Sequence, residues 1–159
     1  MNKLRYLSLI TVISVWAIIV GGIVYSHIAY FPPYLSHLPE SNNLIIGEYG
    51  IQDAAFWSII HPLAIISIFI ALILNWKLKR IRKLILITLG IYVLAIIATV
   101  FYFYPELVAF ADSTNNSSMN PSEWSQRGQH WQHLSWLRGS SMFIGFILLL
   151  IALTKTEPE

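Results

Sequence analysis

Two arginines, two histidines and two tryptophans lie within the twelve residues RGQHWQHLSWLR, at 127–138, of a chain whose charged residues make up only 11%. Histidine exchanges protons near neutral pH. Arginine stabilises a developing oxyanion more strongly where water is scarce. These residue types are therefore suited to proton-transfer chemistry on a lipophilic compound, provided that the fold brings them to one site.

The composition of the chain indicates the class of protein in which these residues lie. The chain has 159 residues, of which 56% are hydrophobic, and it has no cysteine. Its mean hydropathy is +0.62, which is far too apolar for an ordinary soluble domain. We therefore expect a single integral membrane domain over residues 1–159 without disulfides.

Three long stretches of the chain contain no charged residue, and each exceeds the roughly 20 residues that a helix needs to cross the hydrocarbon core. They predict transmembrane helices at 6–29, 54–76 and 84–104. A fourth uncharged run, 139–154, is too short to cross alone. The last helix must therefore begin earlier and bring Arg138 to the outer boundary of the membrane or below it.

The start of this last helix has a sequence signature. Asn120 is a good N-cap, Pro121 suits the first helical position, and Glu123 adds an acid to the first turn. The pattern predicts one helix from about 121 to 154. It would cross the membrane at 135–154, and its first half would stand outside the apolar layer.

Basic residues indicate the orientation. The short segment WKLKRIRK, at 76–83, separates the second and third spans, and further lysines or arginines flank both ends of the chain. The positive-inside rule assigns all of these to the cytoplasm. The sequence therefore predicts an all-α, four-helix transmembrane bundle of up-down-up-down topology with cytoplasmic termini and outer loops at 30–53 and 105–134. Its compact size fits a bacterial inner membrane.

His61 is the first candidate for catalysis. It lies about two turns inside the second span, where an ionisable side chain normally faces the bundle interior and has a partner. Arg138 is expected at a similar depth on the last helix. We predict that His61 acts as a base and that Arg138 stabilises the resulting oxyanion. A purely structural role for either residue is the alternative.

Three further histidines form a candidate metal set. His130 and His133 are three residues apart, so they share a helix face and could chelate one ion. His27, at the outer end of the first span, is the third candidate ligand. The pair lacks the additional ligands that make a zinc or copper motif specific. The alternative is that these histidines are interfacial or solvated.

Candidate residues for binding a substrate lie on the same side of the membrane. They are Trp57, Arg127, Trp131 and Trp136. Aromatic walls with a few polar groups are typical of ligand sites. An interfacial aromatic belt would also explain the tryptophans. Arg127 follows Glu123 by four residues and precedes His130 by three, so a salt-bridged exposed ridge is its alternative.

Three segments resemble a known family: VGGIVYSHIAYFPPYL, FWSIIHPLAII and RGQHWQHLSWLRGSSMFIGFILLL. They are similar to the anthrone-oxygenase-like family of small four-span membrane proteins, many of whose bacterial members are known only as a domain of unknown function. The resemblance covers about residues 10–154. Its matching positions are Arg127, Trp131, Trp136, Leu137 and Arg138. It implies oxidation of a lipophilic aromatic compound by molecular oxygen, with no metal site to carry over. The histidine content and the very apolar third span depart from the family.

Three functions are consistent with these patterns. The first is a cofactor-independent oxygenase or oxidoreductase acting on a small lipophilic aromatic compound. The second is a module that binds haem, copper or a quinone, with His27 and His61 as ligands from two helices. The third is a noncatalytic accessory subunit that docks a partner through its outer helix. We expect the lipid bilayer and a small lipophilic ligand as partners, and no nucleic acid.

Overall fold

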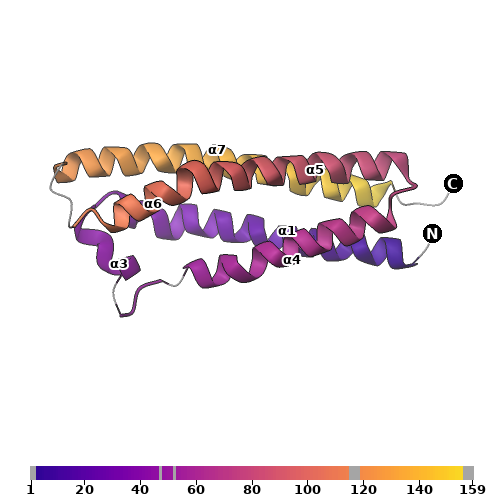
Figure 1. Cartoon of the computed structure of the whole chain (residues 1–159), viewed down its shortest axis with the longest axis horizontal. Coiled ribbons are helices and arrows are strands. Elements are labelled where there is room, and N and C mark those ends of the chain that lie inside the picture. The colour runs from indigo at the N-terminus through magenta and orange to yellow at the C-terminus, as the bar shows by residue number, and fades with distance from the viewer. Residues whose placement is uncertain (1–2, 47, 52, 115–118, 156–159) are drawn as a thin grey trace.

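The computed structural model describes residues 3–46, 48–51, 53–114 and 119–155, and these residues form helices and turns without a strand. Four helical runs in this part of the chain are long and apolar enough to cross a membrane. They are 3–35, 53–74, 79–111 and 121–154. Both termini lie at the end of the bundle where the second run turns into the third (Figure 1). The predicted four-helix transmembrane bundle is confirmed, whereas the side that faces the cytoplasm stays a prediction.

The four runs contain several elements each. The first comprises α1 (Lys3–Tyr25), the π-helical segment η1 (Ser26–Tyr30) and α2 (Phe31–Leu35). A 3₁₀ turn, η2 (Glu40–Asn42), and α3 (Asn43–Ile46) lead to the second run, α4 (Asp53–Leu74). The third comprises α5 (Lys79–Ala98), the π-helical segment η3 (Thr99–Phe103) and α6 (Tyr104–Ala111), and the fourth is α7 (Pro121–Thr154).

Helix α1 forms the centre of the core. It buries Leu9, Val12, Trp16 and Ile19, which recur every three or four residues along one face. This face packs against α4 and α7, and α7 also packs along α5. The consecutive helices α4 and α5 make few contacts with each other. The bundle is therefore tightly packed around α1 and α7 and loosely packed between α4 and α5.

The last helix begins where the sequence predicts. Helix α7 has 34 residues and starts at Pro121. The Asn120 side chain accepts a hydrogen bond from the Glu123 backbone N–H at 3.0 Å, and the Glu123 carboxylate accepts one from the Asn120 backbone N–H at 2.9 Å. This reciprocal capping satisfies two backbone donors that would otherwise lack partners.

The helices continue further into the predicted outer loops than the charge pattern indicates. Within 30–53 and 105–134, α2 extends the first run to Leu35 and α6 extends the third run to Ala111. A second cluster of buried side chains explains this extension, because it packs α2 and α6 against the first half of α7. The cluster includes Phe31, Tyr34, Phe110, Trp124 and Trp131. The bundle therefore has a packed outer cap.

Both π-helical segments precede prolines. Segment η1 ends two residues before Pro32, and η3 ends two residues before Pro105. Proline has no backbone N–H, and its ring clashes with the carbonyl four residues earlier. A wider turn relieves this clash, and such π-turns occur frequently at functional sites. The two segments locally change the direction in which the neighbouring side chains point.

Substitution of Gly128 tests the packing of the outer cap. A Cβ atom at this position would lie 2.8 Å from the Leu35 carbonyl oxygen, whereas one at Gly90 would meet no heavy atom within 4 Å. We expect Gly128→Ala to lower the free energy of unfolding by about 1–3 kcal/mol through overpacking. Gly90→Ala should be neutral or stabilising because alanine favours the helix.

Thermal unfolding of the two variants in the same detergent measures this difference. Equal stability of Gly128→Ala and Gly90→Ala would mean that α2 does not approach α7 closely.

Candidate functional site

A cavity of about 740 Å³ lies between the four helical runs. Its volume is typical of sites for small molecules. It is enclosed by α1 and η1, by the first half of α4, by the run from α5 to α6, and by α7. Both π-helical segments contribute to its wall. Most of the lining is apolar, and its polar side chains include Ser26, His27, Tyr30, Asp53, Ser58, His61, Tyr92, Thr99 and Arg138.

Arg138 brings a cation into this apolar cavity. Its Nη1 donates to the Thr99 hydroxyl at 2.6 Å and its Nη2 donates to the Ser135 hydroxyl at 3.1 Å. Its guanidinium carbon lies 4.2 Å from the centre of the Phe103 ring. In the part of the chain that the structure describes, no carboxylate forms an ion pair with it. Arginine has five N–H donors, so most of them are left for a ligand.

His61 lies beside aromatic rings in the same cavity. Its ring stacks on Trp57, with ring centres 5.3 Å apart, and its Nδ1 lies 2.8 Å from the Tyr92 hydroxyl oxygen. The Tyr92 hydroxyl also lies 3.5 Å from the His61 carbonyl oxygen. When the hydroxyl donates to this carbonyl, Nδ1 must donate to the hydroxyl oxygen, which leaves Nε2 unprotonated. His61 can then accept a proton.

His27 is held differently. Its Nδ1 lies 2.7 Å from the Ile23 carbonyl oxygen, and because a carbonyl can only accept, Nδ1 carries the proton. Its Nε2 is buried without a hydrogen-bond partner. The ring packs between Phe31 and Trp136. Since Nε2 is enclosed by protein atoms, His27 is a poorer base or haem ligand than His61.

Arg138 lines the same cavity as His27 and His61. The structure therefore brings together the predicted pair, His61 and Arg138, at one cavity. Of the other predicted residues, Trp57, Trp131 and His27 also line this cavity.

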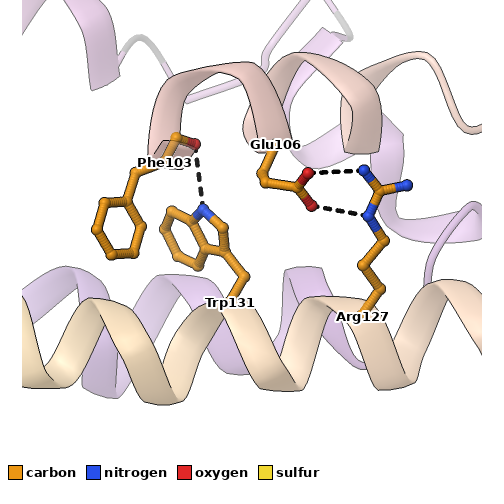
Figure 2. A network of polar contacts seen from close by, with 4 residues as sticks. All are labelled: Phe103, Glu106, Arg127 and Trp131. Atoms are coloured by element: carbon orange, nitrogen blue, oxygen red, sulfur yellow. Dashed lines mark hydrogen bonds and ion pairs between the residues drawn. The ribbon is translucent and has the colours of Figure 1, made fainter. Parts of the chain in front are cut away.

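Arg127 forms a structural ion pair instead of lining the cavity. Its Nε and Nη2 each donate to one carboxylate oxygen of Glu106 at 2.7 Å (Figure 2). The sequence predicts Glu123 as its neighbour on the same helix, but Glu123 instead caps α7. One turn further along α7, the Trp131 indole donates to the Phe103 carbonyl oxygen at 3.1 Å. These contacts join α6 and the end of η3 to α7.

The predicted metal set is not brought together. His130 and His133 are exposed on α7, whereas His27 is buried. Among the described residues, no three His, Asp or Glu side chains are arranged to hold a metal ion. Trp136 contacts the His27 ring at 4.6 Å between ring centres but does not line the cavity.

Several polar residues of the cavity are not among the predicted site residues, and they include Asp53, Tyr92 and Thr99. Tyr92 and Thr99 are seven residues apart, which is two helical turns, on an otherwise apolar span. Asp53 precedes His61 by eight residues and therefore lies on the same face of its helix. Both spacings could have identified these residues.

A double-mutant cycle tests the ion pair between Arg127 and Glu106. The two-pronged geometry and partial burial should give a coupling energy of about 1 kcal/mol between Arg127→Gln and Glu106→Gln in unfolding measurements. The matched cycle of Arg127→Gln with Glu123→Gln should give a coupling energy near zero. A larger coupling in the second cycle would favour the salt-bridged ridge on α7 over the contact between α6 and α7.

Comparisons with protein-family models, with curated proteins and with solved structures found no match to this chain. The resemblance to the anthrone-oxygenase-like family therefore stays a prediction, and the site is interpreted from its own geometry.

Proposed function

We propose that this membrane protein binds a small lipophilic aromatic compound with an ionisable oxygen and deprotonates it for oxidation by molecular oxygen. The observation that carries the proposal is Arg138, a cation without a carboxylate partner among the described residues, in an apolar cavity beside His61. A cation in such surroundings needs a polar or anionic partner. A ligand oxygen can supply that partner.

The cavity walls suit a flat, apolar ring system. Trp57 provides an aromatic surface against which such a ring can pack. The ligand reaches the cavity from the membrane, between α4 and the run from α5 to α6. The sparse contacts between α4 and α5 support this route. So does the exposure of the lining residues Ala54, Ser58 and Pro62 on α4.

Deprotonation uses the two predicted catalytic residues. His61 Nε2 accepts a proton from the bound compound, while Tyr92 holds the ring through Nδ1. The negative charge then develops on the ligand oxygen, which accepts hydrogen bonds from the unused N–H groups of Arg138. Thr99 and Ser135 fix the guanidinium in advance. Donors that are positioned before the reaction stabilise an oxyanion most effectively.

Molecular oxygen is the oxidant in this proposal. For a compound of the anthrone type, the ring CH₂ group loses both hydrogens and becomes a carbonyl. One atom of O₂ becomes the carbonyl oxygen, and the other leaves as water with the two hydrogens. The resemblance to the anthrone-oxygenase-like family supports this chemistry. We also propose a bacterial inner membrane, with the basic end of the bundle in the cytoplasm and the cavity towards the outer side.

Turnover of anthrone under air tests the proposal. In mild detergent, the wild-type protein should consume oxygen and form anthraquinone faster than detergent alone. His61→Gln and Arg138→Gln should each reduce the rate by about 100-fold, because they remove the base and the oxyanion donors. His133→Gln and Arg80→Gln are matched controls with exposed side chains outside the cavity, and they should retain the wild-type rate.

Two results would overturn the proposal. One is a rate that falls equally in the controls and in the cavity variants. The other is a haem absorption band in the purified protein that disappears in His61→Gln, which would establish a haem-binding site instead.

A further inference from the structure

A groove at the start of α5 is separate from the cavity around Arg138. Its volume is about 490 Å³, and it is lined by Lys79, Arg82, Lys83, Leu86 and Ile87. These positions follow the spacing of three and four residues that places side chains on one face of a helix. Along this face three cations come first, and two aliphatic side chains follow one turn later.

The groove faces away from the bundle where α5 enters the apolar layer. Ile81 and Ile85 of the same helix are buried in the core, whereas Leu86 and Ile87 are 42% and 43% exposed. The predicted third span begins at residue 84, so the cations lie outside the hydrocarbon and the aliphatic side chains lie within it. A molecule bound here would meet positive charge at the membrane surface and an apolar wall just below it.

Arg82 is held in position by the turn that precedes α5. Its Nη1 donates to the Trp76 carbonyl oxygen at 3.1 Å, and its guanidinium carbon lies 5.0 Å from the centre of the Trp76 ring. Arginine has five N–H donors in a planar fork that matches the geometry of a phosphate. The contact with the Trp76 carbonyl uses one of these donors, so others remain for a bound anion.

The positive charges of the groove have no acidic partner. No Asp or Glu occurs between Asp53 and Glu106, and none of the three cations forms an ion pair with a residue that the structure describes. Lys79 and Lys83 are four residues apart, where like charges repel each other on a helix. They also lie at the N-terminal end of α5, where the helix dipole disfavours a cation. A bound anion would offset both effects.

We propose that this groove binds an anionic phospholipid. The lipid phosphate accepts hydrogen bonds from Arg82 and pairs with Lys79 and Lys83, and an acyl chain runs along Leu86 and Ile87. A free phosphate would leave the apolar part of the groove uncovered, and a zwitterionic lipid would bring a cation of its own. Basic clusters beside a transmembrane helix attract such anionic headgroups. The site is separate from the cavity, so the inference does not depend on the proposed function.

Lipid binding in a neutral detergent tests the inference, because such micelles carry no surface charge of their own. The probes are phosphatidylglycerol, phosphatidylcholine with the same acyl chains, and glycerophosphoglycerol, which is the anionic headgroup without the chains. Native mass spectrometry measures the bound lipid. The wild-type protein should bind phosphatidylglycerol about tenfold or more tightly than phosphatidylcholine. Glycerophosphoglycerol at the same concentration should not displace the anionic lipid.

Two double variants remove the same number of charges inside and outside the groove. Lys79→Gln with Lys83→Gln should lower the affinity for phosphatidylglycerol by about tenfold or more. Lys77→Gln with Arg80→Gln should change it by less than about twofold, because these exposed side chains do not line the groove and are screened by salt. Arg82→Lys keeps the charge but loses the fork, so its affinity should lie between these two.

Thermal unfolding separates a loss of lipid binding from a defect in folding. Without lipid, the variant lacking Lys79 and Lys83 should be at least as stable as the wild type, because the repulsion between the two lysines is removed. Phosphatidylglycerol should raise the Tm of the wild type and of the variant lacking Lys77 and Arg80. It should raise the Tm of the groove variant less.

Three results would overturn the inference. Equal losses of affinity in the two double variants would mean that the segment attracts anionic lipid only through its total charge. Equal binding of phosphatidylglycerol and phosphatidylcholine by the wild type would show that the cations select no headgroup. Displacement of the lipid by glycerophosphoglycerol would show that the groove binds a free phosphate instead of a lipid.

Discussion

An arginine inside an apolar bundle needs polar partners, and this requirement governs the arrangement around Arg138. Hydrocarbon offers none, so the partners must come from neighbouring helices or from a ligand. Thr99 and Ser135 provide hydroxyl acceptors, and the Phe103 ring faces the guanidinium. In the described part of the chain these contacts supply no negative charge. The bundle therefore positions the cation without neutralising it, as an oxyanion site requires.

Arg138 is accessible from the cavity because the bundle is loosely packed between α4 and α5, whereas the outer cap beside it is tightly packed. Helices α4 and α5 contact each other sparsely, which leaves room for the cavity. Next to it, the Glu106–Arg127 ion pair holds α6 against α7, and the hydrogen bond from Trp131 to Phe103 holds the end of η3 against α7 (Figure 2). The segment η3 carries both Thr99 and Phe103. The contacts of the outer cap thus support the neighbouring wall of the cavity.

The architecture could be predicted from sequence because charge placement and helix length are strongly constrained in a membrane. The uncharged runs predicted four spans, and the capping residues around Pro121 predicted where α7 begins. The site could be predicted only in part. His61 and Arg138 stood out as ionisable side chains at membrane depth, and both line the cavity. Their depth alone was sufficient to select them.

The remaining contacts depend on the rotation of each helix about its axis and on partners distant in the chain. Glu106 lies 21 residues before Arg127, so the local spacing pointed instead to Glu123. The π-helical segments alter the helical period, and the charge pattern contains no sign of them. Asp53 lies just outside the predicted span at 54–76, although its spacing from His61 places the two on one face of α4.

The absorption spectrum of a lipophilic nitrophenol bound to the protein would reveal whether Arg138 stabilises an oxyanion. The titration would be done about one pH unit below the pKa of the free phenol, so that the unbound compound is mostly neutral. An uncompensated cation in an apolar cavity should shift the wild-type spectrum to that of the phenolate, whereas Arg138→Gln should bind the neutral phenol. A neutral phenol bound to the wild-type protein would show that the arginine has only a structural role.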